Sequence, residues 1–259
     1  MGTSGAYGGS GGRAWSNARK KAEEYADLPT NENAAELLSD IADAIEWDAD
    51  NPERQYEPVP LAPSPRFPSR DGGDGPAGGG GGGTVGSSGG GRQRSRSRAA
   101  AVGGSVATAG LAVRAGDDET LRQFGLRLAD LADLEPHEQA RTILDAVAGS
   151  LGAIQEDELQ HAAGVAVLAL LDENATADDA VRAFIADYVF EISITEVGNE
   201  LRNGTRDGYT TVDQEDQLRN LIEACVNQLE LPVQLDATNI QEAIYSALDD
   251  SRTFLSASQ

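Results

Sequence analysis

A long segment rich in glycine and proline divides this chain and limits what each side of it can fold into. It runs from "NPERQYEPVPLAPSPRFPSR" into "DGGDGPAGGGGGGTVGSSGGG". Proline favours extended polyproline geometry and repeated glycine favours a flexible coil, so neither half can build a packed core. We expect residues 50–94 to be a disordered linker. A tether of about 40 residues would let the segment before it range over about 30–40 Å.

The chain after the linker reads as consecutive helices. Apolar residues recur at helical spacing across "ETLRQFGLRLADLADL", which predicts one helix, and again from Pro136, which suits a first helical turn. The apolar segment after His161 is expected to be the central, buried helix. Thr176 is expected to cap the next helix, which runs through "YVFEISIT" to Gly204. The sequence therefore predicts an all-α fold, with a helical bundle as the C-terminal domain over residues 95–259.

Residues 13–49 form a separate short helical segment in this prediction. "RAWSNARKKAEEYADL" and "NENAAELLSDIADAIEWD" both have amphipathic helical patterns, and Asn31 or Asn33 is a plausible cap for the second. The apolar face of the second helix consists of Leu37, Leu38, Ile41, Ala42 and Ile45. Such a hairpin needs a partner surface. Ahead of it, residues 1–12 contain almost no side chains that could offset the entropy of ordering, so we expect a flexible N-terminal tail.

The charge of the chain restricts its partners. The formal net charge is −23, with 43 acidic against 20 basic residues, and the only lysines are Lys20 and Lys21. This composition is typical of a halophilic cytoplasm, where salt screens carboxylate repulsion; an acidic mimic of nucleic acid is the alternative. Direct nucleic-acid binding is not expected, because phosphate binding needs clustered cations. The cluster "RQRSRSR" is read as a basic flank that pairs with carboxylates, with an RNA contact as its alternative.

Few residues are suited to catalysis or cofactor binding. Cys225 lies on an apolar helical stripe, which favours a buried role, and a single cysteine excludes an intramolecular disulfide. Glu158 and His161 form Glu-x-x-His, but no second copy completes a di-metal site, so no metal site is expected and His161 is read as a boundary residue. Phosphate-binding loops and nucleophile motifs are absent. We expect a non-enzymatic, cofactor-free, cytoplasmic protein without a membrane span.

The N-terminus carries the one distinctive chemical group. Removal of Met1 would expose the α-amine of Gly2, and such an amine has a pKa near 7.7–8.0, so part of it is nucleophilic at neutral pH. Glycines would let this end enter a narrow cleft. Myristoylation is disfavoured, because Ala6 stands where Ser or Thr is needed. An ordinary unstructured terminus remains the alternative interpretation.

The opening "MGTSGAYGG", the Pro/Gly linker and the segment "FIADYVFEISITEVGNEL" resemble QatB, a helical component of Qat anti-phage defence systems. The other members of those systems are an ATPase, a QueC-like enzyme and a TatD-like nuclease. The resemblance implies a QueC-like partner that uses ATP to activate a deazaguanine carboxylate. The resemblance makes the α-amine of Gly2 the candidate acceptor of the activated deazaguanine. The residues that would fit the partner's channel are Thr3, Ser4, Tyr7, Gly8 and Gly9.

Two other functions stay open. The chain could be a purely structural adaptor that bridges the ATPase and the nuclease, in which case residues 2–9 would be dispensable. It could also be an acidic decoy for a basic nucleic-acid site, in which case it would compete with DNA in a salt-sensitive way.

Overall fold

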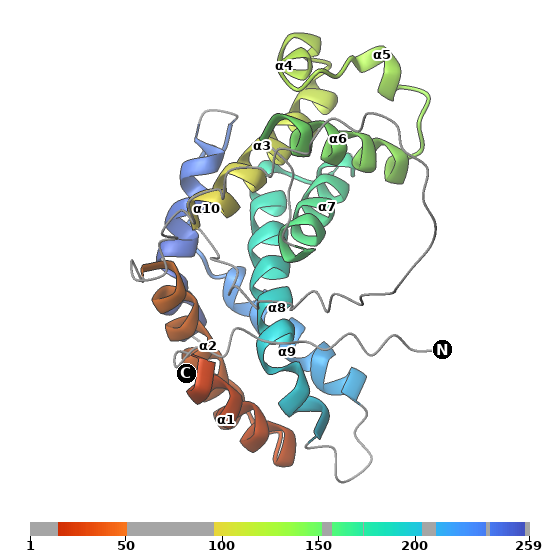
Figure 1. Cartoon of the computed structure of the whole chain (residues 1–259). Coiled ribbons are helices and arrows are strands. Elements are labelled where there is room, and N and C mark those ends of the chain that lie inside the picture. The colour runs from red at the N-terminus through yellow and green to blue at the C-terminus, as the bar shows by residue number, and fades with distance from the viewer. Residues whose placement is uncertain are drawn as a thin grey trace, which may run out of the picture.

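The computed structural model describes residues 15–50, 96–151, 157–172, 174–203, 211–236 and 239–256. Most of the described residues are in helices and none is in a strand, which confirms the all-α prediction (Figure 1). The helices in chain order are α1 Trp15–Asp27, α2 Asn31–Asp50, α3 Arg96–Ala115, α4 Asp118–Gln123, α5 Leu128–Leu131, α6 Pro136–Leu151, α7 Asp157–Leu171, α8 Ala177–Asn203, α9 Thr211–Val226, α10 Ile240–Asp249 and α11 Ser251–Ser256.

Helix α8 is the spine of the bundle. Its 27 residues span about 40 Å at 1.5 Å per residue, and it packs against α7, α9, α1, α10 and α3 (Figure 1). The prediction that the helix after His161 is central is therefore wrong. That helix, α7, packs chiefly on α8, α3 and α6, and Val165 and Leu168 on it stay partly exposed. Apolar composition did not distinguish the two helices, because α8 carries its polar residues at contacts with other helices.

The start of α8 is capped as its sequence predicts. The Thr176 hydroxyl accepts from the backbone N–H of Asp179 at 3.2 Å, and the Asp179 carboxylate accepts from the backbone N–H of Thr176 at 2.7 Å. This reciprocal arrangement is a capping box. The β-branched run "YVFEISIT" continues the helix, with Val189 and Ile192 buried. Tertiary burial on α8 thus outweighs the local preference for a strand.

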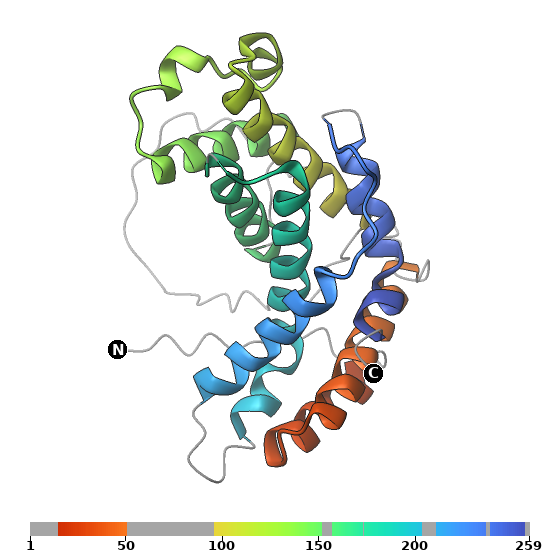
Figure 2. The same cartoon turned by 180° about the vertical axis from the view of Figure 1, so that it is seen from behind.

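The hairpin formed by α1 and α2 belongs to the same core as the rest of the bundle. Helix α1 packs on α8, and α2 packs on α11 (Figure 2). Trp15, the first residue of α1, is fully buried, and the predicted apolar face of α2 is buried throughout. Tyr25 donates to Gln217 of α9 at 3.0 Å. The expectation that this hairpin ranges on a tether is wrong, because the bundle itself is the partner surface that it needs.

Helix α3 crosses its neighbours at very short range because glycines face them. A Cβ placed on Gly103 would lie 2.8 Å from the ring of Phe184, and one on Gly104 would lie 2.6 Å from the Cβ of Gln241 in α10. Glycine removes the side chain that would otherwise hold two helix axes apart. These two positions therefore set how closely α3 approaches α8 and α10.

Two predicted helices are interrupted. "ETLRQFGLRLADLADL" does not form one helix: α4 ends before Gly125, which adopts a left-handed φ of +75°, and α5 begins at Leu128. The Asp118 carboxylate accepts from the Leu128 N–H at 2.9 Å and holds the returning chain. The sequence also predicts one helix over about residues 239–255, and the structure divides it at Asp250 into α10 and α11. Side-chain periodicity continues through both breaks, so it could not reveal them.

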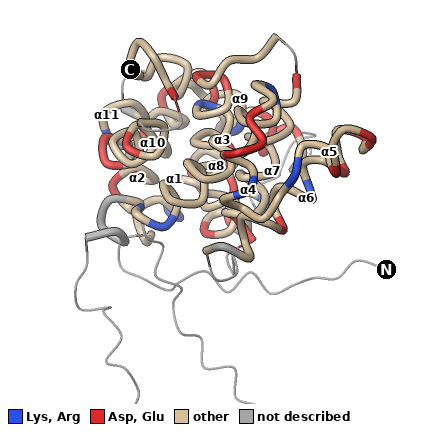
Figure 3. The backbone as a smooth tube through the Cα atoms, turned by 90° about the horizontal axis from the view of Figure 1, so that it is seen from above, with Lys and Arg blue, Asp and Glu red and all other residues tan. Residues whose placement is uncertain are grey.

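Acidic residues lie on several sides of the bundle, including α5, α9 and the corner formed by α10 and α11 (Figure 3). Arg96, from the basic cluster, pairs with Asp249 of α10, as expected for a basic flank on an acidic protein. Arg92 and Arg94 lie outside the described residues. Every helix in the described part of the chain is too short or too polar to span a bilayer.

Candidate functional site

The residues proposed for modification and partner recognition lie outside the described part of the chain. They are Gly2, Thr3, Ser4, Tyr7, Gly8 and Gly9, and the predicted linker over 50–94 is also outside it, apart from its first residue in α2. The structure does describe the point from which the N-terminal segment departs. That point is Trp15, whose indole is fully buried in the core.

Helix α1, which begins at Trp15, is held on α8 by contacts between Arg19 and Glu196. The Nη2 atom of Arg19 lies 2.9 Å from the Glu196 carboxylate, and Nε of Arg19 donates to the Glu196 carbonyl at 3.1 Å. The Glu196 side chain is fully buried, while that of Arg19 is 25% exposed. Gln214 of α9 adds a bond to the carbonyl of Ala26 at 3.2 Å. The first residue of α1 is consequently a fixed position on the bundle.

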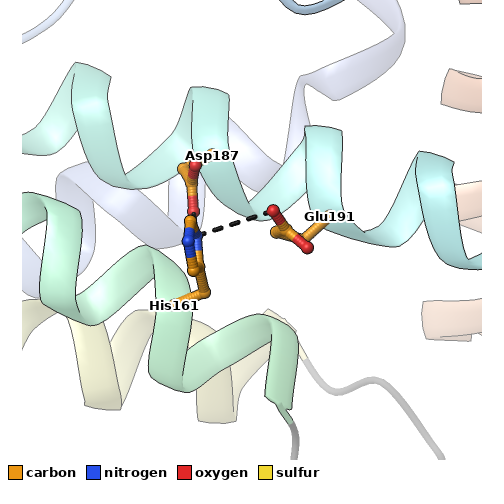
Figure 4. A group of neighbouring side chains, drawn as sticks. All are labelled: His161, Asp187 and Glu191. Atoms are coloured by element: carbon orange, nitrogen blue, oxygen red, sulfur yellow. Dashed lines mark hydrogen bonds and ion pairs between the residues drawn. The ribbon is translucent and has the colours of Figure 1, made fainter. Parts of the chain in front are cut away.

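A second polar site lies between α7 and α8. Nδ1 of His161 is 2.5 Å from Oδ2 of Asp187 and 3.5 Å from Oε1 of Glu191 (Figure 4). Asp187 is only 2% exposed, whereas the His161 side chain is 55% exposed. Because the two carboxylates are one helical turn apart on α8, both face the same imidazole on α7. A buried carboxylate thus orients a ring whose other side is open to solvent.

Arg219 of α9 closes the site from the opposite side. Its Nη1 lies 2.9 Å from Oδ1 of Asp187, and its Nη2 lies 3.7 Å from Oε1 of Glu191. The guanidinium also stacks 3.9 Å above the ring of Phe190. These contacts fix Arg219 over one oxygen of Asp187 and leave the other oxygen to His161.

Burial and neighbouring charges shift the pKa of Glu191 in this cluster. Burial is the main reason that the pKa of Glu191 is raised above the usual glutamate range, and the charges of Asp187 and Glu158 raise it further. His161 and Arg219 act in the opposite direction. Glu158 is itself only 8% exposed. Two carboxylates, those of Asp187 and Glu191, therefore contact one histidine and one arginine, and Glu158 lies near enough to affect Glu191.

A pocket of about 240 Å³ adjoins the cluster and shares Asp187 and Arg219 with it. Val165 of α7, Ala183 and Ala186 of α8, and Val226 of α9 form its apolar part. Arg182 borders the pocket, and its guanidinium caps the end of α9 by donating to the carbonyls of Val226 at 2.6 Å and Leu229 at 2.9 Å. Asp187 and Arg219 of the polar cluster thus form part of the wall of a small pocket between α7, α8 and α9.

Sequence reasoning found only part of this site. Glu158 and His161 were noted as Glu-x-x-His, but Asp187, Glu191 and Arg219 were not considered. A signal was present: Asp187 and Glu191 are four residues apart within the apolar run "FIADYVFEISI", where a buried acidic pair needs partners. Those partners come from α7 and α9, so their identity could not be read from α8. Cys225, by contrast, is buried as predicted.

No protein-family model, curated protein or solved structure matches this chain.

Proposed function

We propose that this chain is a cytoplasmic, non-catalytic component of an anti-phage defence system. In this proposal it binds a QueC-like enzyme and presents its N-terminal Gly2 for ATP-dependent modification, with a deazaguanine as the group transferred. The resemblance of its opening and of "FIADYVFEISITEVGNEL" to QatB suggests the partner. The chemistry is that of an unhindered α-amine attacking an adenylated carboxylate, which forms an amide bond and releases AMP.

The observation that carries the proposal is the rigid attachment of α1. A terminus presented to another enzyme needs a fixed origin, since its effective concentration at the active site depends on how far that origin lies from the site. Trp15 and Arg19 supply such an origin on α8. Residues 2–14 can span at most about 45 Å when fully extended. The partner's active site must therefore lie within about 45 Å of Trp15.

Two lysines make the decisive experiment simple. Lys20 and Lys21 carry the only side-chain amines in the chain. The double substitution Lys20→Arg, Lys21→Arg keeps both charges, including the pairing of Lys21 with Glu24 and Glu36. We expect intact mass spectrometry to show the same added mass in wild-type and lysine-free protein when the QueC-like enzyme is present. Peptide mapping should place that mass on Gly2.

Length provides the matched control. Deleting residues 10–13 shortens the segment before Trp15 and leaves Gly2 and the proposed channel residues through Gly9 in place, and we expect modification to slow markedly or stop. A free peptide of residues 2–14 should be a poor substrate even at high concentration, because it lacks the bundle that docks the enzyme. An unmodified Gly2 beside an active partner would refute the proposal.

The structural-adaptor function makes the opposite prediction. If the bundle only bridges the ATPase and the TatD-like nuclease, removal of residues 2–9 should leave the complex and phage protection intact. Pull-down and plaque assays on that deletion distinguish the two functions.

A further inference from the structure

We propose that His161, Asp187 and Glu191 form a mononuclear site for a divalent transition-metal ion, with Zn²⁺ as the best-fitting ion. This inference is independent of the N-terminal chemistry. It departs from the expectation that the chain has no metal site, which rested on the lack of a second Glu-x-x-His motif. A mononuclear site needs no repeat, and its ligands come here from two different helices.

The positions of the donor atoms suit one ion. Nδ1 of His161 and one carboxylate oxygen each of Asp187 and Glu191 all lie within 4.8 Å of one another. Zinc–ligand bonds of about 2.0–2.2 Å place neighbouring ligands of a tetrahedral ion about 3.4 Å apart. The 3.5 Å distance from Nδ1 to Glu191 is close to that value. Oδ2 of Asp187 is in direct contact with Nδ1 at 2.5 Å and would move away by about 1 Å to admit the ion.

Charge balance also favours a divalent cation. Glu158 lies one turn before His161 on α7 and is near enough to act electrostatically on Glu191. Asp187 and Glu191 share a single guanidinium, that of Arg219, so with a neutral imidazole these groups carry one excess negative charge in a partly buried site. Excess charge is costly at such a position, which favours a cation bound between the two carboxylates.

The donor types narrow the choice of ion. Ca²⁺ and Mg²⁺ are bound by oxygen ligands, whereas one imidazole nitrogen with two carboxylates suits Zn²⁺ and similar first-row ions. Arg219 holds Oδ1 of Asp187 and so directs Oδ2 towards the imidazole, as an outer-sphere partner does in known sites. Three protein ligands leave a further coordination position, and the His161 side chain is 55% exposed, so solvent can reach the site. The ion would fasten α7 to α8 and keep one position open for water.

The test uses full-length protein stripped with a chelator and titrated with Zn²⁺ by calorimetry. Excess Mg²⁺ and about 1 M KCl suppress binding to the acidic surface, since the Debye length there is about 3 Å. We expect one Zn²⁺ per chain. His161→Gln should weaken Zn²⁺ binding by more than about 100-fold, because loss of an outer-sphere partner alone weakens it by about 10–100-fold. His137→Gln is the matched control, because His137 is an exposed histidine of α6, and its affinity should equal that of wild type.

Glu191→Gln and Co²⁺ give independent readouts. Glu191 is less buried than Asp187, so its amide variant is the safer one for folding, and it too should lose tight Zn²⁺ binding. Bound Co²⁺ should give visible d–d absorption that Zn²⁺ abolishes and that both His161→Gln and Glu191→Gln lack. Equal Zn²⁺ affinity in the His161 and His137 variants, or no saturable binding by wild type, would overturn the proposal. Modification of Gly2 tests the proposed function separately and is not expected to depend on either result.

Discussion

The guanidinium of Arg19 in α1 binds both the buried carboxylate and the backbone carbonyl of Glu196 in α8, although the two residues are 177 positions apart in the chain. This pair joins the first described helix to the spine of the bundle. It therefore couples the stability of the fold to the position of the N-terminal segment.

Substitution Arg19→Ala should lower the free energy of unfolding by about 3 kcal/mol, because it leaves the Glu196 carboxylate in the core without its guanidinium. We expect the double variant Arg19→Met, Glu196→Met to recover most of that loss, because it removes both charges of the pair and leaves neither one buried alone. Lys20→Ala, which breaks a 3.7 Å surface pair with Glu24, should cost at most about 1 kcal/mol. Urea unfolding followed by circular dichroism measures all three variants.

The approach of α3 to α10 should depend on Gly104. Gly104→Ala places a methyl group 2.6 Å from the Cβ and 3.0 Å from the Cα of Gln241, so the helices must move apart. We expect a loss of about 1–2 kcal/mol, because this overpacking exceeds the gain in helix propensity. Gly149→Ala in α6 is the control: apart from the neighbouring residues and backbone of α6 itself, no atom lies within 4 Å of the added Cβ, so it should stabilise by up to about 1 kcal/mol. Equal effects of the two substitutions in thermal unfolding would contradict this packing.

The capping box of α8 predicts a pH-dependent contribution. The Thr176 backbone N–H and hydroxyl both donate to the Asp179 carboxylate and lower its pKa below the ordinary value of 3.8. A lowered folded-state pKa means that the contribution is fully present above that ordinary value and is lost as the pH falls through the lowered one.

Asp179→Asn should consequently lower stability at pH 7 by a few tenths to about 1 kcal/mol, and the difference from wild type should shrink as the pH falls below about 4. Urea unfolding from pH 7 downwards, together with NMR titration of the Asp179 carboxyl, measures both effects. A difference that is constant with pH would show that the carboxylate charge does not contribute.

Salt should stabilise this protein. The net charge of −23 makes long-range repulsion a large destabilising term, and raising KCl from about 0.1 M to about 1 M shortens the Debye length from about 10 Å to about 3 Å. We expect the urea concentration at the unfolding midpoint to rise over that range. The slope of the unfolding free energy against urea concentration should stay unchanged. A midpoint that falls with salt would mean that attractive pairs such as that of Arg96 with Asp249 outweigh the repulsion.

The local sequence was sufficient to predict much of the helical structure. The buried face of α2, the Thr176 cap, the start of α6 at Pro136 and the burial of Cys225 all follow from spacing and capping within a few residues. Such features depend on contacts between neighbours in the chain, which a single sequence displays directly.

The relationships between helices could not be predicted in the same way. The docking of α1 on α8, the close crossing at Gly104 and the meeting of His161 with Asp187 join residues separated by 26 to 177 positions. No local pattern specifies which apolar or charged faces will meet, since many pairings bury similar areas. The choice among them is made by the packing of the whole chain, which buries Trp15 at the start of α1 and brings the carboxylates of Asp187 and Glu191 to the imidazole of His161.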